Sequence, residues 1–265
     1  MFRSRKPILA TPGAGLRFGI AMLFVVAAGI SAVAHADTRS VEGFDIDTVV
    51  LRGSDELKIE WSDQHRLLVK GNQSNLDMEP FYVRGKTLYL GYTQNRKSVR
   101  GVKYLLEIDS LEKIVLKGSG TIWVDPIQAR KLKVDLEGSG DIRLHEVTAE
   151  ELEVSVSGSG NVQLAKVSSS SLSLELAGSG EIDLGRVETG ELEIDMAGSG
   201  DIVSDGMGEA ETLEIGLAGS GDIDIQTIRA KRADIGIAGS GDVAYNGEPE
   251  LDTNVMGSGD IRPIH

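Results

Sequence analysis

The chain has 265 residues, with 33 glycines, six prolines and no cysteine. A hydrophobic content of 40% is ordinary for a folded protein and argues against a disordered chain. The 41 acidic against 27 basic residues argue against a nucleic acid partner, because phosphates are neutralised by Lys and Arg. Without cysteine there is neither a disulfide nor a lipid-modified cysteine, so stability must come from burial and hydrogen bonds.

Residues 1–36 are predicted to be an export signal. They contain no acid, an apolar core "FGIAMLFVVAAGI" and a cleavage pattern at Ala34-His35-Ala36. The four basic residues of the leader are Arg3, Arg5, Lys6 and Arg17. The apolar run is shorter than the roughly 20 residues that span a bilayer, which favours a cleaved signal over a membrane anchor. Cleavage after Ala36 leaves residues 37–265, with 23 basic and 41 acidic side chains, in the periplasm or at the cell surface.

Residues 37–104 are expected to form a β-structured N-terminal cap or first coils. The stretches "VEGFDIDTVVLRGSDELKIEW" and "FYVRGKTLYLGY" indicate strands with irregular turns. Seven aromatic residues, which suit the closing of an open end of a stack, gather here: Phe44, Trp61, Phe81, Tyr82, Tyr89, Tyr92 and Tyr104.

The triplet Gly-Ser-Gly recurs eight times in the remainder of the chain. It begins at positions 118, 138, 158, 178, 198, 219, 239 and 257, and apolar residues alternate with polar ones on both sides of it. Such alternation predicts strands with one buried face. A hairpin meander would not require the same residue type at each phase, whereas parallel coils stacked about 4.8 Å apart do. Residues 105–265 are therefore predicted to form an all-β solenoid with coils of about 20 residues.

The order of these segments resembles one bacterial envelope family. "VEGFDIDTVVLRGSDELKIEW", "LLVKGNQSNLDMEPFYVRGKTLYLGY", "LEKIVLKGSGTIWV" and repeated units like "LEGSGDIRL" are similar to the putative auto-transporter adhesin, head GIN domain, over residues 41–262. The resemblance implies a right-handed parallel β-helix in an exported or surface-associated protein. It brings no motif for catalytic or cofactor-binding residues, and no cofactor is expected.

An acidic ladder follows the triplets. The residue after each triplet is, in order, Thr121, Asp141, Asn161, Glu181, Asp201, Asp222, Asp242 and Asp260. A calcium ladder is one interpretation. Carboxylates that cap backbone donors in the turns are the favoured one, because a 20-residue period differs from the nonapeptide of calcium-binding solenoids.

The triplet itself is interpreted as structural. A nucleophilic serine needs a base within hydrogen-bond reach, and His145 is the one histidine in the repeats. The glycines are expected to provide positive φ or a corner too tight for a Cβ. An alternative function, a carbohydrate-active β-helix enzyme, would need acids gathered in one groove, whereas these acids recur by repeat phase.

One basic run interrupts the acidic chain, in "RGKTLYLGYTQNRKSVRGVKY". It is either a solvated loop or a surface that binds an envelope glycan, lipid head group or protein, including the acidic repeats of a second copy. Its candidate binding residues are Arg84, Lys86, Tyr89, Tyr92, Arg96, Lys97, Arg100 and Lys103. After the last triplet only "DIRPIH" remains, so the last coil is expected to present unpaired strand edges. These edges could pair with those of a second copy, which would give an end-to-end homodimer. The sequence thus predicts a non-catalytic, exported interaction or adhesin-like protein.

Overall fold

The computed structural model describes residues 37–264, so the predicted signal at 1–36 lies outside the described residues. The first seven strands are β1 (Asp37–Glu42), β2 (Thr48–Gly53), β3 (Glu56–Trp61), β4 (Arg66–Gly71), β5 (Phe81–Arg84), β6 (Thr87–Leu90) and β7 (Lys103–Ile108). A five-residue helix, α1 (Gln73–Asp77), lies between β4 and β5. Within the described range there is no helix long and apolar enough to cross a bilayer.

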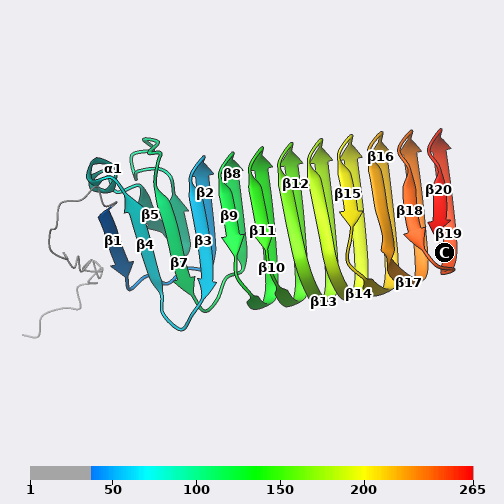
Figure 1. Ribbon diagram of the computed structural model, residues 1–265, viewed down its shortest axis with the longest axis horizontal. Helices are drawn as coiled ribbons and strands as arrows, with labels where there is room; N and C mark the ends of the chain where they lie inside the picture. Colours follow the sequence, from blue (N-terminus) through cyan, green and yellow to red (C-terminus); the bar gives the residue numbers. More distant parts are fainter. Residues whose placement is uncertain (1–36, 265) are drawn as a thin grey trace, which may run out of the picture.

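Thirteen further strands make up the repeats. They are β8 (Lys113–Gly118), β9 (Thr121–Val124), β10 (Ile127–Gly138), β11 (Asp141–Leu144), β12 (Val147–Gly158), β13 (Asn161–Gly178), β14 (Glu181–Gly198), β15 (Asp201–Ser204), β16 (Gly208–Gly219), β17 (Asp222–Gly239), β18 (Val243–Asn246), β19 (Glu250–Gly257) and β20 (Ile261–Ile264). Figure 1 shows them as one elongated stack running to the C-terminal end.

The predicted all-β solenoid is confirmed. The strands before each corner form one parallel ladder, called ladder A, in the order β6-β2-β8-β10-β12-β13-β14-β16-β17-β19. The strands after each corner form a second parallel ladder, ladder B, in the order β7-β3-β9-β11-β13-β14-β15-β17-β18-β20. Equivalent residues stack, as Val134, Val154, Leu174 and Ile194 do.

The alternating apolar residues fill the inside of the tube. Leu172, Leu174 and Leu176 are at most 2% exposed, and their neighbours along the strand point to solvent. Each such side chain contributes roughly 1.5–3 kcal/mol when fully buried, although the ordering of the chain offsets most of the sum. A single coil has no partner for its apolar face, so the core exists only because the coils are stacked.

Both glycines of the triplet are required, each for a different reason. Gly158 has φ +128°, and a Cβ there would lie 2.3 Å from the carbonyl oxygen of Gly138 in the preceding coil. At Gly160 the conformation is ordinary, but a Cβ would lie 2.4 Å from the carbonyl oxygen of Gly140. The intervening Ser159 donates its backbone N–H to the Gly138 oxygen at 2.9 Å and exposes its side chain. The two expected uses of glycine, positive φ and a tight corner, are both confirmed.

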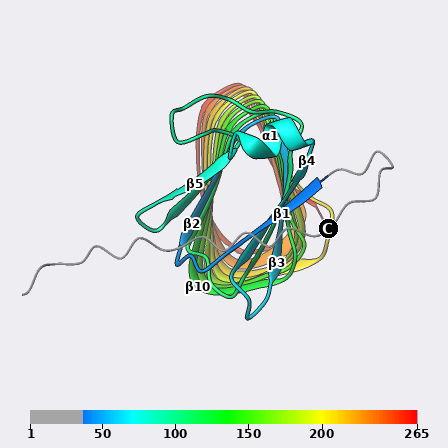
Figure 2. The same cartoon turned by 90° about the vertical axis from the view of Figure 1, so that its left-hand side faces the viewer.

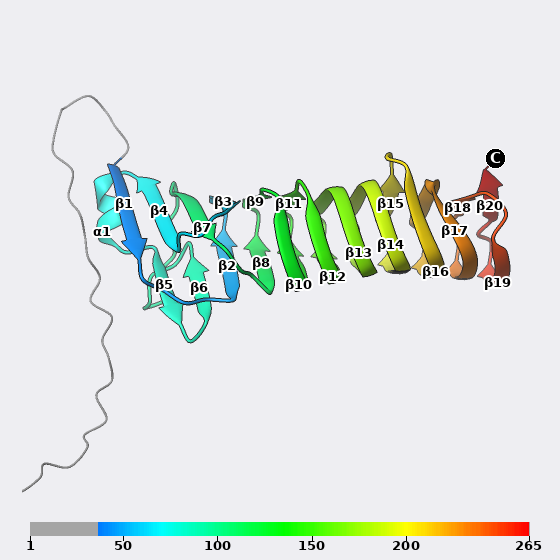
Figure 3. The same ribbon diagram turned by 90° about the horizontal axis from the view of Figure 1, so that it is seen from below.

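The N-terminal end departs from the order of the chain. Strands β2 and β3 pair with β8 and β9 on one side and with β6 and β7 on the other. Strands β6 and β7 therefore lie nearer the N-terminal end of the stack than β2 and β3, although they come later in the chain. The end is completed by antiparallel strands: β4 pairs with β7 and β1, and β5 pairs with β6. Figure 3 shows the β5–β6 hairpin projecting from this end. Figure 2, which faces the end, shows α1 above the opening of the tube.

Candidate interaction surface

An aromatic and cationic stack forms the outer face of the β5–β6 hairpin. Tyr82 and Tyr89 occupy directly opposite positions on the two strands, and their rings stack with centroids 4.8 Å apart. The guanidinium of Arg52, on the adjacent β2, lies 5.6 Å from the ring centre of Tyr89. The strand alternation causes this arrangement, because it turns Phe81 and Leu88 inward and the two tyrosines outward.

The tip of the same hairpin carries two of the predicted binding residues. Arg84 and Lys86 flank Gly85, whose φ of +63° makes the turn. The Nζ atom of Lys86 lies 3.8 Å from a carboxylate oxygen of Asp45 and 4.0 Å from one of Asp47. Arg84 is exposed and has no carboxylate within 4.0 Å in the described structure.

The loop between β6 and β7, residues 91–102, leaves the opposite end of β6. Its tip is a closed turn: Thr93 and Lys97 are joined by a backbone hydrogen bond of 2.9 Å, and the N–H of Arg96 donates to the Thr93 oxygen at 2.8 Å. Arg96 adopts φ +63°, the left-handed conformation that non-glycine residues rarely adopt. The base of the loop is held by Asn75, whose side chain donates to the Arg100 oxygen at 2.7 Å. The turn therefore presents Arg96, Lys97 and Arg100 on an ordered backbone.

Asp55 anchors this loop, and the sequence analysis missed it. Its Oδ1 atom accepts hydrogen bonds from the N–H groups of Gly101 (2.8 Å) and Val102 (3.2 Å). Burial raises the pKa of the Asp55 carboxyl above its ordinary value, while these two hydrogen bonds and Arg100 act in the opposite direction. The sequence does carry a signal for this anchor, the triplet "GSD" at residues 53–55. Gly53 pairs with Gly118, the first glycine of the first Gly-Ser-Gly triplet, so residues 53–55 form an additional corner in which Asp55 replaces the last glycine.

The eight predicted binding residues are thus divided rather than gathered. Arg84 and Lys86 lie at one end of β6, whereas Arg96, Lys97 and Arg100 lie beyond its other end. Tyr89 belongs to the ring stack between them, Tyr92 forms an isolated bridge with Ser98, and Lys103 is paired with Glu56 at 2.6 Å. The loop cluster of Arg96, Lys97 and Arg100, called the basic loop below, is the largest group of exposed cations here without a carboxylate within 4.0 Å in residues 37–264.

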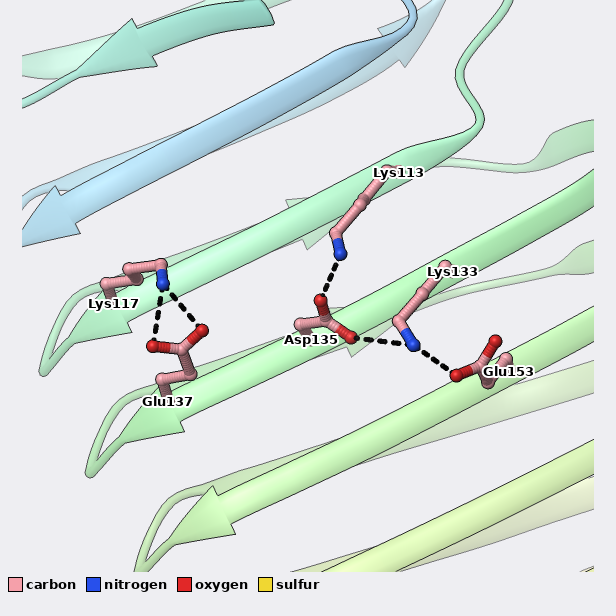
Figure 4. A network of polar contacts seen from close by, with 6 residues as sticks. All are labelled: Lys113, Lys117, Lys133, Asp135, Glu137 and Glu153. Carbon is pink, nitrogen blue, oxygen red and sulfur yellow. Dashed lines mark hydrogen bonds and ion pairs between the residues drawn. The ribbon is translucent and has the colours of Figure 1, made fainter.

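Most cations of the described repeats, in contrast, are paired with a carboxylate of a neighbouring coil or of their own coil. The Nζ atom of Lys117 lies 2.6 Å from a carboxylate oxygen of Glu137, and that of Lys113 lies 2.5 Å from a carboxylate oxygen of Asp135 (Figure 4). Lys133 contacts Glu153, and this carboxylate raises the pKa of the lysine. Such pairs contribute little stability at an exposed surface. Their consequence here is that the outer faces of these coils offer few free positive charges.

In the last coils the acidic ladder caps backbone donors, but those of the next coil rather than of its own turn. The N–H of Asp242 donates to Oδ1 of Asp222 at 2.9 Å, and the N–H of Asp260 donates to Oδ1 of Asp242 at 2.9 Å. In earlier coils the equivalent N–H donates to a glycine carbonyl, as Asp201 does to Gly180. Within residues 37–264 no three His, Asp or Glu side chains are placed to hold one metal ion.

One acid of the repeats has a raised pKa. Repulsion from Asp183 is the main cause of the raised pKa of Glu181, with burial and Asp201 adding to it. These side chains lie on the outer face of ladder B, where Asp201 and Asp222 continue the position of Glu181, whereas the position of Asp183 is Val203 in the next coil. The triplet serines, such as Ser159 and Ser179, are exposed at the corners. The serines therefore form a regular row along the solenoid, and the acids form a second row that Thr121 and Asn161 interrupt.

The two parallel ladders define a β-solenoid domain. Residues 45–168 and 164–263 match the family described as putative auto-transporter adhesin, head GIN domain. The chain belongs to this family, which confirms the resemblance seen in the repeats.

Similar solved structures cover most of the chain. A putative lipid binding protein from Parabacteroides distasonis ATCC 8503 is 28% identical, with a TM-score of 0.76 over 88% of this chain and 98% of that one. A putative adhesin from Parabacteroides merdae ATCC 43184 is 16% identical, with a TM-score of 0.74 over 88% of this chain and 97% of the other. A putative adhesin from Bacteroides fragilis NCTC 9343 is 22% identical, with a TM-score of 0.66 over 89% and 100%. The last two share the fold. No curated protein matches the chain.

Proposed function

We propose that this protein is a non-catalytic, exported binding protein of the bacterial envelope, in the periplasm or at the cell surface. In this proposal residues 105–265 are a rigid scaffold, and residues 37–104 carry the surface that contacts an envelope glycan or protein. Membership of the adhesin head family supports an interaction role. The similarity to a putative lipid binding protein supports a place in the envelope.

The basic loop is the observation that carries the proposal. Arg96, Lys97 and Arg100 are exposed, and none of them has a carboxylate within 4.0 Å in the described part of the chain, whereas Lys117 and Lys131 of the solenoid are neutralised by the next coil. The loop backbone is held in place by Asp55, so its cations are displayed at little cost in ordering. An ordered positive surface of this kind fits an acidic polysaccharide or an acidic protein face.

Binding of mature chain 37–265 to purified envelope polysaccharide and to envelope protein fractions tests the proposal. The test variant carries Arg96→Glu, Lys97→Glu and Arg100→Glu. The matched control carries Arg130→Glu, Arg229→Glu and Arg232→Glu, three exposed arginines of the repeats that have no carboxylate within 4.0 Å among residues 37–264. We expect at least a tenfold loss of binding in the test variant alone, and weaker wild-type binding as salt is raised. Equal binding by the two variants would show that the basic loop is not the binding surface.

We also propose end-to-end association through the last coil. Leu251 and Val255 of β19 are each 42% exposed, although they continue the inward rows of the coil before. In the described structure β19 pairs only with β17, and β20 only with β18, which leaves two strand edges open. Light scattering on the mature chain should show a dimer that Leu251→Lys converts to a monomer. A monomeric wild type would refute this association.

A further inference from the structure

The sheets of the solenoid end in two edge strands at the N-terminal end. Among residues 37–264, β5 pairs with β6 alone and so ends the sheet of ladder A. On the other side β4 and β1 follow β7, and β1 pairs within the same range with β4 alone. The two edges approach each other where the guanidinium of Arg39 in β1 lies 5.9 Å from the ring centre of Phe81 in β5. Figure 2 shows β5 and β1 on opposite sides of the opening of the tube.

The backbone of β5 has hydrogen-bonding groups that point away from β6. Arg84 and Thr87 are the pair that closes the two-residue turn of the hairpin. The pair closing such a turn is hydrogen-bonded, and hydrogen-bonded pairs alternate with other pairs along an antiparallel ladder. The N–H and C=O groups of Phe81 and Val83 therefore point to the open edge. In the described structure neither residue makes a backbone hydrogen bond outside strand pairing.

Val83 shows that β5 lacks a neighbouring strand. It lies on the same face of the hairpin as Phe81, because side chains alternate along a strand. Its partner Leu88 is 1% exposed, whereas Val83 is 44% exposed. A groove of about 570 Å³ runs beside β5 and is bounded on its other side by residues 41–44. Leu88 and Leu67 are buried and close the floor of this groove, so an occupant would lie along its surface and not inside the tube.

We propose that β5 binds an extended peptide segment of a partner protein, which adds a strand to this open edge. The free backbone groups of Phe81 and Val83 are the donors and acceptors that an added strand requires. This surface is separate from the basic loop, and the proposal does not rest on the proposed function.

The side chains along β5 define the peptide that fits. The peptide residues opposite Phe81 and Val83 are apolar, because they face the groove. The residue opposite Tyr82 is aromatic, because it extends the ring stack of Tyr82 on Tyr89. The residue opposite Arg84 is acidic, because Arg84 is exposed and has no carboxylate within 4.0 Å in the described part of the chain. Read antiparallel to β5, the sequence recognised is acidic, apolar, aromatic, apolar.

The test measures binding of a synthetic peptide to mature chain 37–265 by calorimetry. The peptide contains Glu-Val-Tyr-Val between short polar flanks, so that its two valines pair with Val83 and Phe81. We expect saturable binding. Methylation of the backbone nitrogens of the two valines removes the N–H groups that point to β5, and should weaken binding by about tenfold or more. The matched control is methylation of the Glu and Tyr nitrogens, which point away from β5 and should leave most of the affinity.

Variants of β5 test the same contacts from the protein side. Val83→Pro removes the outward N–H at an edge position where proline is tolerated, and should weaken binding by about tenfold or more. Val83→Thr keeps this N–H and should bind within a few-fold of the wild type. Arg84→Glu should weaken binding of the Glu peptide and strengthen binding of a peptide with Lys in place of Glu. Leu251→Lys, at the opposite end of the solenoid, should change neither.

The proposal is overturned if the peptide does not bind saturably, if the two methylated peptides bind equally, or if a folded Val83→Pro binds like the wild type. The variant with Arg96→Glu, Lys97→Glu and Arg100→Glu should retain peptide binding. Loss of binding in this variant alone would assign the peptide to the basic loop and also overturn the proposal. If circular dichroism shows that Val83→Pro does not fold, the two methylated peptides still decide the question on the wild-type chain.

Discussion

Replacement of Gly158 by Ala tests how the corner holds two coils together. The new Cβ would meet the Gly138 oxygen at 2.3 Å, and the residue would keep a φ of +128° that side chains rarely adopt. Backbone strain of this kind costs about 1–3 kcal/mol, and overpacking against a fixed neighbour costs about 1–3 kcal/mol more. We therefore expect the free energy of unfolding to fall by about 2–6 kcal/mol. For a chain of this size that lowers the melting temperature by roughly 5–20 °C.

Gly236→Ala is the matched control in the same solenoid. Its Cβ would find nothing nearer than the Ile215 oxygen at 3.8 Å, and its backbone needs no special conformation. This change should be neutral or stabilise by about 0.4–1 kcal/mol, because alanine restricts the unfolded chain. Urea unfolding followed by circular dichroism measures both variants. If Gly158→Ala were as stable as Gly236→Ala, the corner would be more tolerant than its geometry indicates and the reasoning would be wrong.

Three further changes test the polar contacts. Asp55→Asn should equal or exceed the wild type in unfolding free energy near neutral pH. The raised pKa means that the folded state holds the proton more tightly, so the carboxyl costs stability as pH rises through its folded pKa, and the difference should shrink on acidification; a constant difference contradicts this. Asp222→Ala should cost about 0.5–1.5 kcal/mol in urea unfolding, since the Asp242 N–H loses its acceptor, while Asp222→Asn should cost less; equal losses would refute the cap. Lys133→Ala should cost less than about 1 kcal/mol, because its partner Glu153 is also near solvent, and a larger thermal shift would show that the pair is structural.

The repeats were predictable because the residue pattern within each repeat specifies which side chains are buried and where the chain turns. Alternation around Val154 and Leu174 determines which side chains face inward, and the recurring triplet determines where the chain turns. A constant period then leaves parallel stacking as the arrangement that buries every apolar row. The core, the register and the structural use of glycine all follow from these local patterns.

The N-terminal region was less predictable because its contacts are not periodic. Nothing local to β2 shows that it lies between β6 and β8, strands that follow it in the chain. The corner at Gly53 was hidden because its last position is Asp55, whose partners are 46 and 47 residues away. The basic run appeared continuous in sequence, but the β5–β6 turn sends Arg84 and Arg96 to opposite ends of one strand.

The contacts of the acidic ladder were likewise predictable from the sequence only in part. The sequence places Asp222 and Asp242 at equivalent positions after the triplet, and the turn chemistry of Asp indicates a backbone cap. Which N–H is capped depends on the coil above, a neighbour about 20 residues away that only stacking brings near.

The sequence by itself determined the class of fold, the inward rows and the acidic outer surface, because residue type and period suffice for these. The tertiary structure decided the order of strands at the N-terminal end and the anchoring of the basic loop by Asp55. These features depend on which distant segments meet when the end of the tube is closed. Local hydrophobic patterning does not encode that choice, because each segment would bury its apolar face equally well against several partners.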